Sequence, residues 1–188
     1  MSLLINLAIR TSRVVDLANE RIGRAVAWLN LLVVLIIFAV VVARYAFNAG
    51  WVALQESAVY FYCFVFLFGA GYTLKRDDHV RVDIFYQKLS ARGRAWINIL
   101  GTVFLLFPFI GFILWASWDY VMASWDIHES SREAGGLPWV YLWKTAILAM
   151  AILVALQGLA ELLRNLVFVV QGARSTEAEQ GADHRPEV

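Results

Sequence analysis

Four long apolar segments dominate this chain, and each is long enough to cross a lipid bilayer as a helix. They cover residues 25–43, 51–74, 95–118 and 137–163 of the 188. A helix needs about 20 mainly apolar residues to span a hydrocarbon core of about 30 Å. We therefore predict an all-α integral membrane protein with four transmembrane helices.

The composition agrees with a membrane protein and argues against several other classes. Hydrophobic residues make up 61% of the chain and charged residues 16%, against about 25% charged residues in soluble proteins. The single cysteine, Cys63, excludes an intrachain disulfide and a thiolate cluster. The sequence has no Gly-rich phosphate loop and no metal-binding His–Glu spacing. We expect no catalytic site, no cofactor, no metal ion and no nucleic-acid partner.

Basic residues are distributed unevenly between the two ends of the predicted helices. Three of them belong to one side: Arg44, Arg132 and Lys144. Thirteen belong to the other: Arg10, Arg13, Arg21, Arg24, Lys75, Arg76, Arg81, Lys88, Arg92, Arg94, Arg164, Arg174 and Arg185. Because Lys and Arg gather in cytoplasmic segments, both termini and the 75–94 connection are predicted to be cytoplasmic.

The charge pattern also divides the chain into three parts. Residues 1–24 are predicted to form an amphipathic helix, residues 25–170 the four-helix transmembrane domain, and residues 171–188 a polar, disordered tail. Two interpretations of the first helix remain open. Its apolar face lies in the cytoplasmic membrane interface, or it packs against protein.

The connections carry local signals of their own. The 75–94 connection is expected to form a short surface helix. Three of its residues are predicted to anchor it at the cytoplasmic side: Arg76, His79 and Arg81. Ser90 is a candidate N-cap of the third transmembrane helix. Pro108 lies in the middle of that helix and predicts a kink, because proline lacks a backbone N–H.

Glu56 is the strongest candidate for a functional residue, because a carboxylate inside a membrane span is costly to bury. Three roles remain open for it: a salt bridge with Arg44 across the first hairpin, a contact with a second membrane subunit, and ion or proton coupling. Lys144 in the fourth span either extends to the membrane surface or pairs with Asp119 or Glu56. Arg44, Glu56 and Lys144 are therefore candidate pairing or subunit-interface residues.

Residues 119–136 form the only sizeable segment on the side opposite the termini, and they are rich in charge. We expect them to contact a partner on that side of the membrane. The candidate contact residues are Asp126, Glu129, Arg132 and Glu133.

Several short motifs occur in a fixed order along the spans. They are Arg44, the segment from Trp51 to Glu56, Phe-Gly-Ala-Gly-Tyr at 68–72, Arg-Asp-Asp-His-Val-Arg-Val-Asp at 76–83, Gly-Gly-Leu-Pro-Trp at 135–139 with Lys144, and Leu156-Gln157-Gly158 leading into Glu161 and Arg164. In this order and spacing the chain resembles the small membrane subunit of tripartite ATP-independent periplasmic (TRAP) transporters, the DctQ-like family, over about residues 25–165.

The resemblance implies a division of labour in a bacterial inner membrane. A periplasmic solute-binding protein captures an organic acid or related solute, and a large sodium-coupled subunit moves it by an elevator-type motion. The small subunit would be a scaffold in the lipid bilayer for that large TRAP permease subunit. Because this chain has four spans, we expect the large subunit to be a separate chain.

An autonomous small proton-coupled exporter is the alternative function. Glu56 would then be its coupling carboxylate, close to the aromatic residues Tyr60 and Phe64. Against this reading, Glu56 lies towards one membrane surface, whereas a symmetric exchange site is expected near the midplane.

Overall fold

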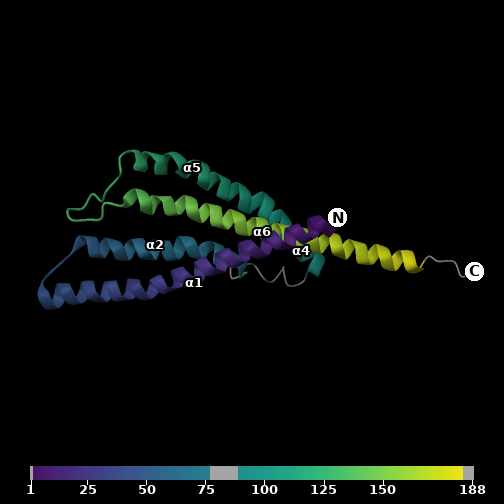
Figure 1. Cartoon of the computed structure of the whole chain (residues 1–188), viewed down its shortest axis with the longest axis horizontal. Helices are drawn as coiled ribbons and strands as arrows, with labels where there is room; N and C mark the ends of the chain where they lie inside the picture. The colour runs from purple at the N-terminus through teal and green to yellow at the C-terminus, as the bar shows by residue number, and fades with distance from the viewer. Residues whose placement is uncertain (1, 77–88, 184–188) are drawn as a thin grey trace, which may run out of the picture.

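The computed structural model describes residues 2–76 and 89–183, and the regular structure of these residues is helical. The helices are α1 (Ser2–Phe47), α2 (Val52–Lys75), α4 (Ala91–Gly101), η1 (Thr102–Leu106), α5 (Phe107–Asp126) and α6 (Val140–Asp183) (Figure 1). The helices α4, η1 and α5 follow one another without a break and form one rod of 36 residues. The described residues thus contain four helical rods that are long and apolar enough to cross a membrane, which confirms that part of the prediction.

The long helix α6 joins the two halves of the molecule. Helices α1 and α2 form one antiparallel hairpin, α5 and α6 form the other, and α2 packs on α6 (Figure 1). The connections 48–51 and 127–139 lie at the same end of the molecule. At the opposite end the N-terminal half of α1 crosses α6, and α4 also packs on α6.

The buried core lies along α6 and consists of small clusters. In one, Leu74 of α2 and Ile110 of α5 pack on Ala151 and Val154 of α6. Lipid tails are as apolar as these side chains, so close packing and polar contacts stabilise such helix interfaces more than exclusion of water does. The polar contacts between the rods therefore have particular weight in this fold.

Large apolar side chains cover the outer surface of the rods. Trp28 and Phe38 of α1 are 74% and 66% exposed, and Trp115 of α5 is 77% exposed. Such a surface is stable only against lipid or another membrane protein, because soluble proteins do not expose apolar patches of this extent.

Helix α1 runs through the boundary that the sequence suggested at residue 24. It is 46 residues long and contains no proline and a single glycine, Gly23, so no backbone signal ends the helix there. Gly23 is buried, and a methyl group at this position would collide with the side chain of Tyr72. The glycine therefore serves the close approach of α1 and α2.

The third rod contains a π-helical turn just before Pro108. The N–H of Phe107 donates to the carbonyl of Thr102, five residues back. The missing N–H and the ring of Pro108 disturb regular α-helical bonding, and a π turn is one way in which a helix accommodates such a disturbance. At the start of the rod the hydroxyl of Ser90 accepts a hydrogen bond from the N–H of Gly93 at 3.2 Å, which confirms the predicted N-cap.

Two further predictions from the sequence concern the C-terminal tail and the 75–94 connection. Helix α6 continues to Asp183, so residues 171–183 are helical, whereas the sequence suggested a disordered tail over residues 171–188. The expected surface helix, with His79 and Arg81, falls within residues 77–88, which lie outside the described residues.

Candidate functional site

Glu56 lies at the beginning of α2 and binds the connection between α5 and α6. One carboxylate oxygen, Oε2, accepts a hydrogen bond from the backbone N–H of Leu137 at 2.7 Å. The other, Oε1, accepts a short hydrogen bond from the hydroxyl of Ser131. Glu56 therefore ties the first hairpin to the connection of the second.

The expected salt bridge between Glu56 and Arg44 is absent. Both residues are described, and the structure forms no ion pair between them. Arg44 is exposed at the end of α1, whereas Glu56 is half-buried under the 127–139 connection. Of the three roles left open for Glu56, the structure thus does not form the salt bridge with Arg44. Its partners are a backbone N–H and a serine of a distant loop, which helix spacing does not reveal.

Lys144 forms an ion pair with Glu129 and not with Asp119 or Glu56. Its side chain is 11% exposed, so it does not simply extend into solvent. Glu129 also accepts a hydrogen bond from the hydroxyl of Ser124 at 2.6 Å. The ammonium of Lys144 lies 3.9 Å from the centroid of the Tyr120 ring, within range of a cation–π interaction. The hydrogen bond from Lys144, followed by that from Ser124, lowers the pKa of Glu129 below its usual value.

Aromatic side chains pack next to these polar contacts. The rings of Tyr60 and Trp143 stack with their centroids 5.0 Å apart. The indole N–H of Trp125 donates to Thr145 Oγ1 at 2.8 Å. These contacts join α2 to α6 and α5 to α6 at the end of the molecule that carries the 127–139 connection. We call the set of Glu56, Ser124, Glu129, Ser131, Leu137 and Lys144 the loop cluster.

The four residues expected to contact a periplasmic partner fall into two groups. Asp126, Arg132 and Glu133 are exposed. Glu129 is half-buried and engaged with Lys144. The first three side chains are thus available to a partner protein, whereas Glu129 stabilises the end of the second hairpin.

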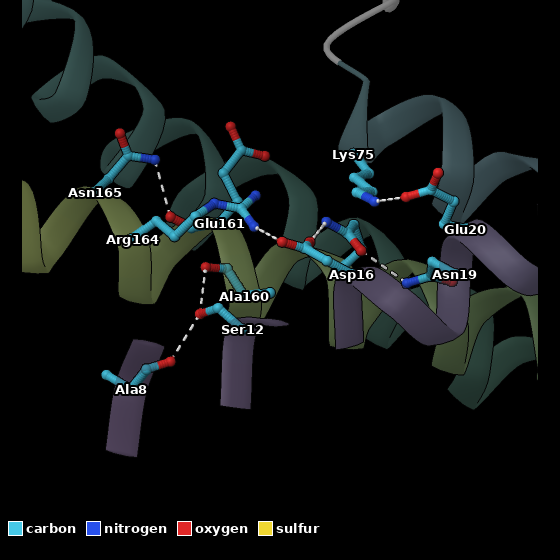
Figure 2. A network of polar contacts seen from close by, with 11 residues as sticks. Ala8, Ser12, Asp16, Asn19, Glu20, Lys75, Ala160, Glu161, Arg164 and Asn165 are labelled. Carbon is cyan, nitrogen blue, oxygen red and sulfur yellow. Dashed lines mark hydrogen bonds and ion pairs between the residues drawn. The ribbon is translucent and has the colours of Figure 1, made fainter. Parts of the chain in front are cut away.

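A second group of polar residues joins α1 to α6 where the two helices cross (Figure 2). The amide of Gln157 is fully buried between Asn19 and Asp16. Its Oε1 accepts from Asn19 Nδ2 at 2.8 Å, and its Nε2 donates to Asp16 Oδ1 at 2.8 Å. Arg164 donates to the other oxygen of Asp16 at 2.6 Å. The carboxylate of Asp16 therefore fixes the orientation of both amides, because only an N–H can face it.

Neighbouring contacts extend this group to α2 and along α1. The hydroxyl of Ser12 lies 2.9 Å from the carbonyl oxygen of Ala8 and 3.2 Å from that of Ala160, and these two acceptors share its single hydrogen. Lys75 of α2 forms an ion pair with Glu20 of α1, which also binds Arg24 (the Lys75 contact is drawn in Figure 2). We call the set of Ser12, Asp16, Asn19, Glu20, Lys75, Gln157 and Arg164 the crossing cluster.

Asn19 has one oxygen that the crossing cluster does not satisfy. Within the part of the chain that the structure describes, Asn19 Oδ1 has no hydrogen-bond partner. It lies against the backbone of α2 at Gly71, where a methyl group would be 2.6 Å away. Close approach of α1 and α2 thus depends on glycine at position 71.

The sequence interpretation did not find the crossing cluster. It considered only the apolar face of segment 1–24, as a face for the membrane interface or for protein, and Leu7 and Val14 of that face are 57% and 61% exposed. Ser12, Asn19 and Gly23 are buried in their place. The signal was the spacing of small and polar residues, which places Ser12, Asp16, Asn19 and Gly23 on one helix face. Residues 12–23 therefore pack on protein through their small and polar face, and a place of the exposed apolar face in the membrane interface stays a prediction.

The predicted cytoplasmic anchor is described only at Arg76. This residue follows the last turn of α2, and its guanidinium lies 5.0 Å from the centroid of the Tyr72 ring. No group of three or more His, Cys, Asp or Glu that could hold a metal ion occurs among the described residues.

Comparison with known proteins gives a family match over most of the chain. The model of a family described as "Tripartite ATP-independent periplasmic transporters, DctQ component" matches residues 9–168, which include both polar clusters. The chain is also similar to the C4-dicarboxylate TRAP transporter small permease protein DctQ of Vibrio cholerae serotype O1 (strain ATCC 39315 / El Tor Inaba N16961). The two are 31% identical over 86 residues, which is 46% of this chain and 37% of that relative. No solved structure matches the chain significantly.

Proposed function

We propose, from the premise that the chain belongs to the DctQ family of TRAP transporters, that it is a scaffold for a separate large permease subunit. Members of this family are the small permease component of a tripartite system. The chain is accordingly a multi-pass membrane protein of a bacterial transporter and not an enzyme.

One observation carries the scaffold role. Three polar side chains inside the rods bind other parts of the same chain: Glu56 holds a loop, Lys144 holds Glu129, and Gln157 holds α1 on α6. A solute path needs polar groups that face a cavity and change partners during transport. A scaffold needs polar groups that fix its helices relative to one another. The pairing of these side chains supports the second role.

The remaining parts of the proposal follow from the family. The large subunit couples uptake to sodium and moves by an elevator-type mechanism, and a periplasmic binding protein delivers the solute. The complex resides in the inner membrane, with the exposed apolar surface of the small subunit against lipid and the large subunit. The solute is an organic acid, and a C4-dicarboxylate is the first to test, because the similar Vibrio protein is named for it.

Reconstitution in liposomes tests the scaffold role. This chain, the large subunit and the binding protein would be combined singly and together, and uptake of a labelled C4-dicarboxylate would be measured under a sodium gradient. We expect uptake only when all three are present. Empty liposomes and liposomes with the large subunit alone are the controls.

Two outcomes would contradict the proposal. Solute flux through liposomes that contain only this chain would favour the autonomous exporter, and loss of that flux in Glu56→Gln would assign the coupling role to Glu56. Full uptake by the large subunit and the binding protein without this chain would exclude a scaffold that transport requires.

A further inference from the structure

We propose that Glu56 is a positioning residue whose carboxylate holds the 131–137 loop in a single conformation. Glu56 belongs to α2, whereas the loop connects α5 to α6, so the contact joins segments 75 and 81 residues apart. This role differs from a salt bridge with Arg44 and from ion coupling.

Each oxygen of the carboxylate has its own donor in the loop. The hydroxyl of Ser131 donates to Oε1, and the N–H of Leu137 donates to Oε2 at 2.7 Å. Leu137 is followed by Pro138, which has no N–H to offer. The carboxylate therefore binds the last backbone donor before that proline.

The loop closes on itself around the same residues. The N–H of Ser131 donates to the carbonyl of Leu137 at 3.0 Å, and the N–H of Gly136 donates to the carbonyl of Glu133 at 3.0 Å. The hydroxyl oxygen of Ser131 also accepts from the N–H of Glu133 at 3.1 Å. Ser131 is thus bound on both sides, and Glu56 supplies the contact that fixes the closed loop to α2.

Gly136 leaves the space that this arrangement needs. A methyl group at position 136 would lie 2.8 Å from Glu56 Oε2 and would collide with the side chain of Ser131. A side chain at this position would therefore separate the carboxylate from the loop without changing the charge of Glu56.

A carboxylate suits this position better than an amide of the same shape. Glu56 faces two donors with two acceptor oxygens, and hydrogen bonds to an ionised carboxylate are stronger than neutral ones. Glutamine could accept from the N–H of Leu137 with its oxygen, but its NH₂ group would have to donate to the hydroxyl of Ser131, which reverses that hydrogen bond, and both contacts would lose the charge of the carboxylate.

The consequence for binding rests on the proposed function. The loop presents Arg132 and Glu133 as exposed charged side chains at its tip. A loop that is already ordered loses less conformational entropy when it binds another protein. Holding the loop closed would thus favour contact of its tip with the binding protein outside the membrane.

Hydrogen exchange of the full-length chain in lipid nanodiscs tests the proposal directly. In Glu56→Gln we expect the peptide that covers residues 131–137 to exchange roughly ten- to a hundredfold faster, the change expected when two charge-assisted hydrogen bonds become neutral ones. Gly136→Ala should accelerate the same peptide, although it retains Glu56. Glu133→Gln is the matched control, because it removes a carboxylate of the same loop that is exposed, and it should leave the exchange unchanged.

Several outcomes would overturn the inference. Unchanged exchange in Glu56→Gln and in Gly136→Ala would show that the carboxylate does not hold the loop. Equal acceleration in Glu133→Gln would show that any loss of charge opens it. If Glu56→Gln fails to fold, hydrogen exchange of Gly136→Ala and Ser131→Ala tests the proposal instead, because both residues lie outside the spans.

The affinity of the binding protein for the reconstituted complex then tests the consequence. We expect weaker binding in Glu56→Gln and in Gly136→Ala than in the unchanged complex, because both substitutions loosen the loop and leave the exposed charges of Arg132 and Glu133 in place. Faster exchange with unchanged affinity would show that Glu56 holds the loop, but that the order of the loop does not favour contact with the binding protein. Failure of the scaffold role in the liposome experiment would leave the exchange result intact, so the two failures are distinguishable.

Discussion

Gly71 and Gly69 lie two residues apart in α2, and their surroundings differ in a way that a substitution can measure. A methyl group at Gly71 would be 2.6 Å from the amide oxygen of Asn19, whereas one at Gly69 would meet nothing within 4 Å. We expect Gly71→Ala to destabilise the protein by about 1–3 kcal/mol, the usual cost of overpacking a tight contact. The thermal unfolding midpoint in detergent is the measurement.

Gly69→Ala is the matched control for this prediction. The same change at a position with free space should be neutral, or stabilising by about 0.5–1 kcal/mol, because alanine favours helix. Equal effects of the two substitutions would mean that α1 does not approach α2 closely at Asn19.

Single residues were predictable where their chemistry is unusual, and their partners were not. Glu56 and Lys144 stood out because ionisable groups are rare inside spans. The partners of Glu56 belong to a loop 75 or more residues away, and one of them is a backbone N–H that every residue type except proline carries. Gln157 drew attention only as part of a motif, since one amide in an apolar helix does not say which helix it faces.

At the scale of elements, the crossing of α1 over α6 can be tested by disulfide formation. The hydroxyl of Ser12 is 3.2 Å from the carbonyl oxygen of Ala160, so α1 and α6 approach each other closely at these two positions. In a Cys63→Ser background, Ser12→Cys with Ala160→Cys should form an intrachain disulfide on mild oxidation, detected by mass spectrometry of linked peptides.

The control pair uses a neighbouring residue on the other face of α1. Val14 is 61% exposed, so Val14→Cys with Ala160→Cys should remain reduced under the same conditions. If the Val14 pair forms the link and the Ser12 pair does not, the apolar face of α1 packs on α6 and the crossing cluster is wrong.

The sequence predicted which segments are helical better than it predicted where the helices begin and end. Each predicted span coincides with one long rod over most of its length, because some 20 apolar residues in a row leave few alternatives. Two spans were predicted to begin too early, since α2 begins at Val52 and α6 at Val140. The rods extend beyond the apolar segments, since polar residues such as Asp16 and Arg164 continue a helix when they find partners across it. The π turn before Pro108 was not foreseen, because proline disturbs the helix without determining how the backbone adapts.

In the whole molecule, polar contacts join the two hairpins at both ends, with an apolar region between them. The loop cluster joins α2 to the second hairpin at one end, and the crossing cluster joins α1 and α2 to α6 at the other. Helices fixed at two separated points resist both sliding and splaying. This arrangement suits a subunit that stays in place while another one moves.

Orientation in the membrane is a property of the whole molecule, and it is the last prediction. Thirteen basic residues belong to the predicted cytoplasmic side and three to the other. In the structure the N-terminus, α4 and the C-terminal part of α6 lie at one end, opposite the 127–139 connection (Figure 1). Because basic residues are retained in the cytoplasm, we expect both termini there and the 127–139 connection in the periplasm. A green fluorescent protein fused to the C-terminus should fluoresce, and Ala134→Cys in a Cys63→Ser background should react with an impermeant thiol reagent added to whole cells. A dark fusion together with an unreactive Cys at 134 would reverse the orientation, and Arg132 and Glu133 would then face the cytoplasm, out of reach of any periplasmic protein.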